Sequence, residues 1–290
     1  LGIYMLINVG GSAGGQLLAN LGDANGFTMF IFSSVLLSLA IVPMTLSASA
    51  NPPVPTTSSM PFWELYRLVP SAVVGTTFAS FVQAAMSSMA MVFAIEAGMS
   101  TGKATVFVGA GLTGAIFLQI PLGRLSDRFP RRIIILFCVF VSATIAGAQS
   151  LLSNSSDLHI FLNFLFGAFV FPLYGLFAAL ANDWIPSEKR ISASSTLVLA
   201  SSSGAVVAPI VLGFLLGNFA PSSYFLANAT VLTVIGVYIS YRTRVREAVP
   251  VEKQSPFIPL VARSGQIAHS LGRWIRNPLA VWPKEKSDQE

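Results

Sequence analysis

The segment from Gly123 to Arg132, GRLSDRFPRR, holds the residues with the clearest chemical potential in this sequence. Its one carboxylate is Asp127, and guanidinium groups form strong, often bidentate hydrogen bonds with carboxylates. Asp127 can also face the positive N-terminal end of a helix, and Gly123 would let two helices approach closely and turn. The arginines can pair with carboxylates on a neighbouring helix, and the alternative is a basic loop that only sets the topology. Its basic residues are Arg124, Arg128, Arg131 and Arg132.

A second charged segment, NDWIPSEKR at residues 182–190, supplies carboxylates for such ion pairs. Its acidic residues are Asp183 and Glu188, and Arg190 follows them at the start of the next apolar run. We hypothesise that Asp183 or Glu188 pairs with Arg128 or Arg131. Such a pair would hold one side of the protein closed.

Polar side chains inside the long apolar runs are few, and almost all of them are uncharged. No acidic, basic or histidine residue lies in the middle third of any run. Glu96 comes closest, and we favour an interfacial place for it over a proton or cation site. The amide and phenol groups either bind a polar solute or form hydrogen bonds between helices. These residues are Asn8, Gln16, Gln83, Gln119, Asn163 and Tyr174.

The composition indicates that membrane-spanning helices position these residues. Of the 290 residues, 53% are hydrophobic and 10% are charged, whereas soluble domains are about 25% charged. The apolar runs have the length of about 20 residues that a helix needs to cross a bilayer, and a helix pairs its backbone groups within lipid. We therefore expect an all-α membrane protein. The expected spans are Leu1–Leu21, Phe27–Leu46, Leu65–Ile95, Thr105–Leu122, Ile133–Leu152, Ile160–Ala181, Ala193–Asn218 and Tyr224–Tyr241.

Lysine and arginine are distributed asymmetrically between the two sets of loops. One set holds ten of them, whereas the alternate set holds only Lys103. Basic loops stay in the cytoplasm, so the chain is expected to enter and end there. The ten are Arg67, Arg124, Arg128, Arg131, Arg132, Lys189, Arg190, Arg242, Arg244 and Arg246.

A proline-rich stretch divides the spans into two groups. Residues 1–46 form the first two spans, 47–64 a linker, 65–241 the last six spans, and 242–290 a basic cytoplasmic tail. The linker contains Pro52, Pro53 and Pro55, which do not continue a helix. In the tail, apolar and arginine residues recur at near-helical spacing, so an amphipathic helix on the membrane surface and a disordered tail both remain open.

The segment from Gly123 to Arg132 resembles the signature loop of the major facilitator superfamily, except that Pro130 replaces its usual glycine. The segment at 182–190 is similar to the loop between helices 10 and 11 of that family. The resemblance implies a bundle of 12 helices, of which the eight spans here are helices 5–12 and the linker is the central loop. Because the chain begins with Leu1 and not Met, we expect four further spans upstream.

This resemblance implies a secondary transporter that moves a small solute by alternating access and works as a monomer in a bacterial inner membrane. Helices 7, 8, 10 and 11 of the family contribute to its central cavity. Gln83 and Asn163 are accordingly the favoured cavity residues, followed by Tyr174, Gln119 and Glu96. Proton coupling stays open, and the substrate is not identified. The tail at 250–259 and the first residues also resemble a group of uncharacterised bacterial permeases.

A membrane-embedded enzyme, a channel or a receptor is the alternative class. The sequence offers two histidines, His159 in an expected outer loop and His269 in the tail, which supply neither a metal site nor a catalytic dyad. We expect no cofactor. Most basic residues lie at helix ends or in the tail, which argues against nucleic-acid binding. The single cysteine, Cys138, is expected to be buried and inert.

Overall fold

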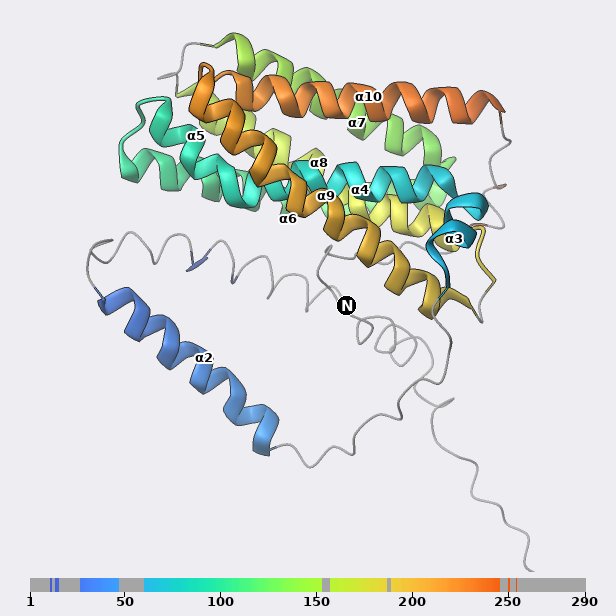
Figure 1. The fold of residues 1–290 in the computed structure, drawn as a ribbon, viewed down its shortest axis with the longest axis horizontal. Coiled ribbons are helices and arrows are strands. Elements are labelled where there is room, and N and C mark those ends of the chain that lie inside the picture. The colour runs from blue at the N-terminus through green and yellow to red at the C-terminus, as the bar shows by residue number, and fades with distance from the viewer. Residues whose placement is uncertain are drawn as a thin grey trace, which may run out of the picture.

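The computed structural model describes residues 11, 14–15, 27–46, 60–152, 157–186, 189–245, 250 and 254 of the chain. Regular structure in these residues is entirely helical (Figure 1). The expected span Leu1–Leu21, with Asn8 and Gln16, therefore lies largely outside the described residues. So do the linker from 47 to 59, Glu188 and nearly all of the tail. The helices are α2 Thr28–Leu46, α3 Phe62–Leu68, α4 Pro70–Ala84, the π-helical turn η2 Ala85–Met89, α5 Ala90–Glu96, α6 Thr101–Arg128, α7 Arg131–Leu151, α8 Leu158–Asn182, α9 Arg190–Asn218 and α10 Ser223–Val245.

Six helical stretches are long and apolar enough to cross a bilayer. They are the continuous stretch from α4 to α5, and then α6, α7, α8, most of α9 and α10. These six match the last six of the eight expected spans. The expected span Phe27–Leu46 is occupied by α2, whose described apolar part, Phe30–Val42, is shorter than the six. The structure supports a multi-pass helical membrane protein, and the count of eight spans stays a prediction.

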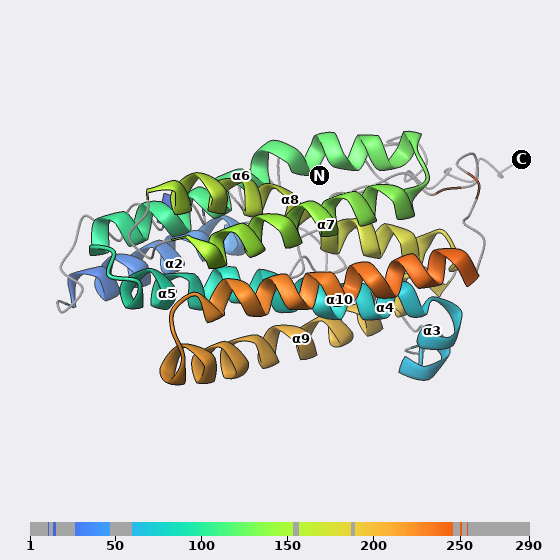
Figure 2. The ribbon, with the colours of Figure 1, turned by 90° about the horizontal axis from the view of Figure 1, so that it is seen from above.

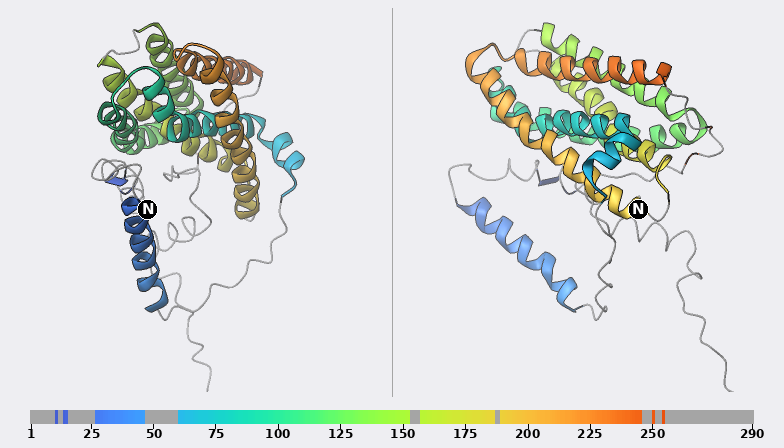
Figure 3. Two further views of the ribbon diagram at one scale, coloured as in Figure 1. Left: turned by 60° about the vertical axis from the view of Figure 1, so that its left-hand side comes forward. Right: turned by 45° about the vertical axis from the view of Figure 1, so that its right-hand side comes forward.

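The six spans pair across the two halves of the sequence that contains them. The most extensive contacts join α6 to α8, α4 to α9 and α7 to α10. Figure 3 shows α7 and α10 side by side, while α9 runs obliquely across one face of the bundle in Figure 1. Of the six spans, α8 is the most buried and α9 the least. The bundle is therefore built around α8, which packs on α4, α6 and α7.

Glycines bring the backbones of paired helices into direct contact. A Cβ atom on Gly114 of α6 would overlap the backbone of α8, and one on Gly167 of α8 would overlap the carbonyl oxygen of Gly111 on α6. In the same way Gly204 of α9 lies against the carbonyl oxygen of Thr77 on α4. Small residues permit this approach, which increases van der Waals contact between helices in lipid.

The expected span Leu65–Ile95 is wrong at its start, because a proline divides it. Val69 has φ −138° and ψ 66°, outside the helical region, and Pro70 begins α4. Proline disfavours a helical conformation at the residue before it and has no N–H to donate to the preceding turn. The result is a separate short helix, α3, which turns away from the axis of α4 (Figure 2).

The signature segment is also more helical than expected. The fourth of the expected spans was to end at Leu122, but α6 continues to Arg128, so that Gly123 and Asp127 lie within it. The turn is reduced to Phe129, with φ −121° and ψ 160°, and Pro130, with φ −53° and ψ 116°. Neither conformation requires glycine, so Pro130 is compatible with this turn.

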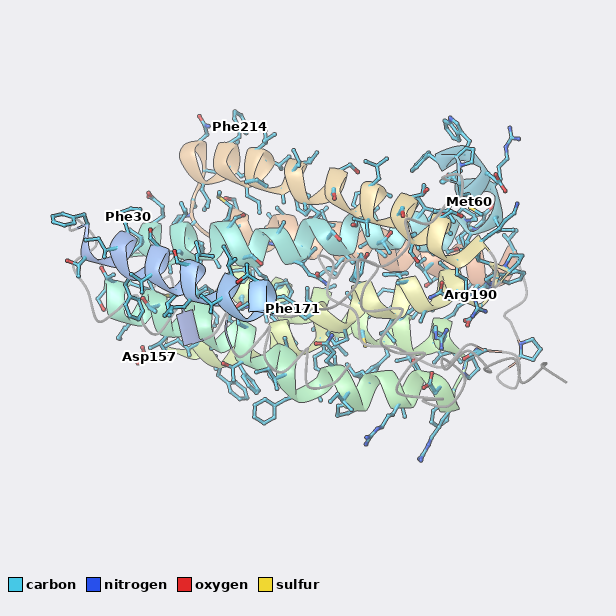
Figure 4. All side chains as sticks on the ribbon, turned by 90° about the horizontal axis from the view of Figure 1, so that it is seen from below. Phe30, Met60, Asp157, Phe171, Arg190 and Phe214 are labelled. Carbon is cyan, nitrogen blue, oxygen red and sulfur yellow. The ribbon has the colours of Figure 1, made fainter. Side chains whose placement is uncertain are left out.

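Most of the basic residues of the bundle gather at one of its ends. We call this the basic end, defined by Arg67, Arg128, Arg131, Lys189 and Arg244. Figure 4 shows Met60 and Arg190 at that end and Asp157 at the opposite one. The arrangement agrees with the alternation of loops that the charge asymmetry predicted.

Candidate functional site

A buried ion-pair network lies at the basic end, and we call it the Arg131 triad: Arg131, Asp183 and Asp127. Nη1 of Arg131 donates to both carboxylate oxygens of Asp183 at 2.7 Å. Nη2 lies 3.2 Å from Oδ1 of Asp127. The side chains of Arg131 and Asp183 are each 1% exposed, and that of Asp127 is 35% exposed. The triad therefore joins the end of α6, the start of α7 and the end of α8 in a region with little water.

The positions of Arg131 and Asp183 at helix ends explain why their pairing is favourable. Arg131 is the first residue of α7, where the helix dipole disfavours a positive charge, and Asp183 directly follows α8, where it disfavours a negative one. Each charge is thus badly placed on its own helix. Their pairing offsets both effects, and it also compensates for the loss of water around two buried ions.

The other charged residues that the sequence singled out lie in different surroundings. Arg128 is exposed and forms no ion pair with any other residue in the described part of the chain. Arg132 is buried at the start of α7. Nε of Arg190 donates to the carbonyl oxygen of Ile185 at 3.3 Å. Of the four pairings that the sequence allowed, the structure contains the one between Asp183 and Arg131. Those with Glu188 fall outside the described residues.

Gln83 connects two helical spans near the middle of the bundle. It stands two residues before η2, and its Nε2 donates to the carbonyl oxygens of Val170 at 3.3 Å and Phe171 at 3.2 Å. Those carbonyls immediately precede Pro172, the proline inside α8. Figure 4 shows Phe171 midway along the bundle. The side chain thus bridges the π-helical turn of one span and the proline of another.

Replacing Gln83 with leucine is expected to lower the free energy of unfolding by about 0.5–2 kcal/mol, the range found for interhelical hydrogen bonds in lipid. Thermal unfolding in detergent measures the change. Gln119→Leu is the matched control, because Gln119 is also buried but forms no hydrogen bond among the described residues. Equal effects of the two substitutions would contradict a specific role for the Gln83 bond.

The remaining predicted solute-binding residues occupy three kinds of place. Asn163 is buried, and its Nδ2 donates to the carbonyl oxygen of Phe107 on α6 at 2.8 Å. Tyr174 is buried beside Ser201 of α9. Glu96 is exposed at the end of α5, opposite the basic end. The sequence left two roles open for Gln83 and Asn163, solute binding and hydrogen bonding between helices. The structure contains the interhelical hydrogen bonds of both residues. A cavity role for any of the five residues stays a prediction.

Two pairs of serines were not among the solute-binding residues predicted from the sequence. Ser87 and Ser88 lie in η2 and are exposed, although their span is otherwise apolar. Ser202 and Ser203 are exposed on α9, which packs against η2. The signal available in the sequence was a pair of hydroxyls within an apolar run. The structure places both pairs on the surface of the bundle.

His159 corrects the outer-loop assignment. It lies in the first turn of α8 and is 1% exposed. Its Nδ1 is 3.5 Å from Oε1 of Gln149, and its ring stacks on Phe225 with centroids 5.7 Å apart. Phe93 contacts the same ring edge-on. Helix packing therefore explains this histidine, and the described residues contain no group of three side chains that could hold a metal ion.

The comparisons with known proteins concern most of the chain. The family model for the Major Facilitator Superfamily matches residues 72–282. The chain is similar to an uncharacterised MFS-type transporter of Enterobacter sp. (strain 638), with 22% identity over 233 residues, which are 80% of this chain and 60% of that protein. It is 23% identical over the same shares to the uncharacterised MFS-type transporter YcaD of Escherichia coli O17:K52:H18 (strain UMN026 / ExPEC) and of Escherichia coli O9:H4 (strain HS). The chain thus spans 60% of the length of these relatives. No solved structure matches it.

Proposed function

Because this chain belongs to the major facilitator superfamily, we propose that it is the C-terminal part of a secondary active transporter that moves a small solute by alternating access. The six spans would be helices 7–12, α2 would be helix 6, and residues 1–21 would be helix 5. The charge asymmetry and the bacterial relatives support an inner membrane location with the basic end in the cytoplasm. The full-length protein would work as a monomer.

The observation that carries this proposal is the Gln83 bridge between two spans that each contain an irregular feature. The six spans divide into two repeats of three, which begin with the α4–α5 span and with α8. Each of these first spans has an irregular feature near its middle, the π-helical turn η2 in one and Pro172 within the continuous helix α8 in the other, and Gln83 joins the two features. In secondary transporters, helix irregularities at corresponding positions of repeats point to the solute site.

The groups near this bridge suggest how the solute is bound. The exposed hydroxyls of η2 and α9, with Gln119 of α6 and with Tyr174, which lies two residues after Pro172 and beside Ser201, would supply neutral hydrogen-bond donors and acceptors. No acidic or basic side chain lies in the middle of a described span. We infer that this half recognises its solute by hydrogen bonds without charge, and that any proton-coupling carboxylate belongs to the other half.

The Arg131 triad would act as a brace within this half. Its three residues belong to α6, α7 and α8, and glycines hold α6 and α8 in backbone contact. Helices in such contact have little freedom to separate. Movement would then take place between the two halves of the transporter. Arg128, exposed at the same end, would pair with a carboxylate of the other half and hold the cytoplasmic side closed.

Cysteine labelling tests whether the serine pairs face a water-filled cavity. In a cysteine-free form of the full-length protein, Ser87→Cys and Ser202→Cys are expected to react with a charged thiol reagent that does not cross the membrane. Phe137→Cys is the control, because Phe137 is 50% exposed on α7, where we expect lipid. Equal protection of all three cysteines would contradict the cavity. Uptake of a panel of labelled solutes into proteoliposomes, with and without a proton gradient, then tests transport itself.

A further inference from the structure

We propose that the groove between α3 and the segment that joins α8 to α9 binds the head group of an anionic phospholipid of the inner leaflet. This groove, which we call the α3 groove, has a volume of about 520 Å³. Met60, Leu68 and Pro186 supply its apolar surface, and Trp63, Arg67 and Lys189 lie at its rim. None of its lining residues belongs to the Arg131 triad or to the serine pairs, and the proposal does not depend on transport.

The charge of the α3 groove fits a phosphodiester. Nζ of Lys189 lies 3.0 Å from Oε1 of Glu64, the one acidic residue among the described residues that line the groove, and both side chains are about half exposed. Arg67 is exposed and forms no ion pair within the described ranges. One positive charge therefore remains uncompensated. A phosphodiester carries one negative charge, and the planar guanidinium of Arg67 can bind two of its oxygens.

The position of α3 is that of a helix at the membrane interface. It ends just before Pro70, where the first of the six spans begins, and it lies at the basic end. Three aromatic residues share this helix, with ring centroids 5.7 Å apart for Phe62 and Trp63, 5.9 Å for Trp63 and Tyr66, and 6.3 Å for Phe62 and Tyr66. Phe62 and Trp63 are exposed. Aromatic rings concentrate at the level of lipid head groups, where one side of each ring is apolar and the other wet.

The α3 groove is held open by the fold and needs no rearrangement to receive a head group. Leu65 is fully buried and packs in a cluster with residues of α4, α8 and α9. The hydroxyl of Thr196 on α9 donates to the carbonyl oxygen of Met60 at 2.6 Å. These contacts fix both walls. A preformed site loses less entropy on binding than one that must first become ordered.

A lipid fits the α3 groove better than a free anion does. An ion such as phosphate would use the cations at the rim but leave the apolar surface of Met60, Leu68 and Pro186 in water. A phospholipid places its phosphate at the rim and its glycerol and first methylene groups against that surface. Basic pockets at the cytoplasmic face of a membrane protein are typical sites for anionic head groups.

The site also adjoins the Arg131 triad. Trp184 follows Asp183 in the chain and packs against the same buried cluster as Leu65. A bound head group that links α3 to the segment after α8 would therefore add a second brace at the basic end.

The test measures lipid binding to the full-length protein in neutral detergent by native mass spectrometry. The probes are phosphatidylglycerol, phosphatidylcholine, and glycerophosphoglycerol as a head group without acyl chains. Each cation near anionic lipid contributes about five-fold in affinity, so Arg67→Gln and Lys189→Gln are each expected to weaken phosphatidylglycerol binding by about that factor. Glu64→Gln is expected to leave binding equal or stronger. Arg244→Gln, which removes an exposed charge at the same end but outside the groove, is the matched control and should change binding less than two-fold.

Four results would overturn the proposal. Equal losses in Arg67→Gln and Arg244→Gln would mean that the basic end attracts lipid without a site. Equal binding of phosphatidylcholine would remove the role of charge, and binding of glycerophosphoglycerol as tight as that of the intact lipid would indicate an anion site. Binding unchanged in both groove variants would mean that another part of the protein covers the α3 groove. Unfolding midpoints in phosphatidylcholine confirm that each variant is folded, as expected for exposed side chains.

Discussion

Replacing Asp183 with asparagine is expected to lower the free energy of unfolding by about 3–5 kcal/mol, the loss typical when one partner of a buried ion pair is removed. The substitution preserves the size of the side chain but removes the bidentate partner of the buried Arg131. Asp127 remains as a counter-charge, but it lies 3.2 Å away and is 35% exposed. No water is available to solvate a guanidinium that is 1% exposed. Thermal or denaturant-induced unfolding in a mild detergent measures the effect.

Two further variants separate the ion pair from other causes. Asp157→Asn makes the same chemical change in an ion pair with Lys103 at the opposite end, where the two side chains are 79% and 57% exposed, and it is expected to have no measurable effect. The double variant Arg131→Met with Asp183→Leu removes both buried charges and should be more stable than Asp183→Asn alone. A double variant less stable than the single one would show that the triad has another structural role.

Replacing Gly167 with alanine is expected to be the other severe change. Its Cβ atom would overlap the carbonyl oxygen of Gly111, a backbone atom that cannot rotate away as a side chain does. The backbones of α6 and α8 would have to separate, and this is the most extensive helix contact in the bundle. Overpacking of this kind typically costs about 1–3 kcal/mol, and a backbone clash belongs at the upper end of that range. Unfolding in the same detergent gives the size of the loss.

The matched control for Gly167→Ala is Gly109→Ala on α6. An added Cβ there would have no neighbour within 4 Å. Alanine favours a helix over glycine by up to about 1 kcal/mol, so this variant should be as stable as the original protein or more so. If Gly109→Ala and Gly167→Ala destabilise equally, then the loss comes from the helix itself and not from the contact between α6 and α8.

The sequence predicted the six described spans well because bilayer length and low charge are strong physical signals. The sequence did not predict where a helix is divided or irregular, or where it continues beyond the apolar run. Pro70 is a signal for a helix break, but the apolar run around it favoured one continuous span. The π-helical turn η2 has no distinct composition, because its residues AMSSM would fit an α-helix equally. The extension of α6 to Arg128 was hidden by the loop character of the family motif.

The candidate site was predictable in its residue types but not in its pairing. Charge and spacing left Asp183 and Glu188 as partners for Arg128 or Arg131. Only the packing of α7 against α8 brings Arg131 to Asp183, while Arg128, three residues earlier, belongs to α6 and is exposed. The bonds of Gln83 and Asn163 to backbone carbonyls also depend on how helices far apart in sequence are rotated, and hydrophobic periodicity does not encode this.

The pairing of the spans has a consequence for how the protein is made. Each of the most extensive contacts joins one of the first three spans to one of the last three: α6 to α8, α4 to α9, and α7 to α10. Helices enter the membrane in the order of synthesis and associate afterwards. While the ribosome is still completing α9 and α10, α4 and α7 must therefore remain in lipid without their main partners, and Gly204 cannot yet cover Thr77. The bundle is assembled late and as a whole, so a nascent chain that stalls before α10 exposes the unpaired faces of α4 or α7 to the quality control of the membrane.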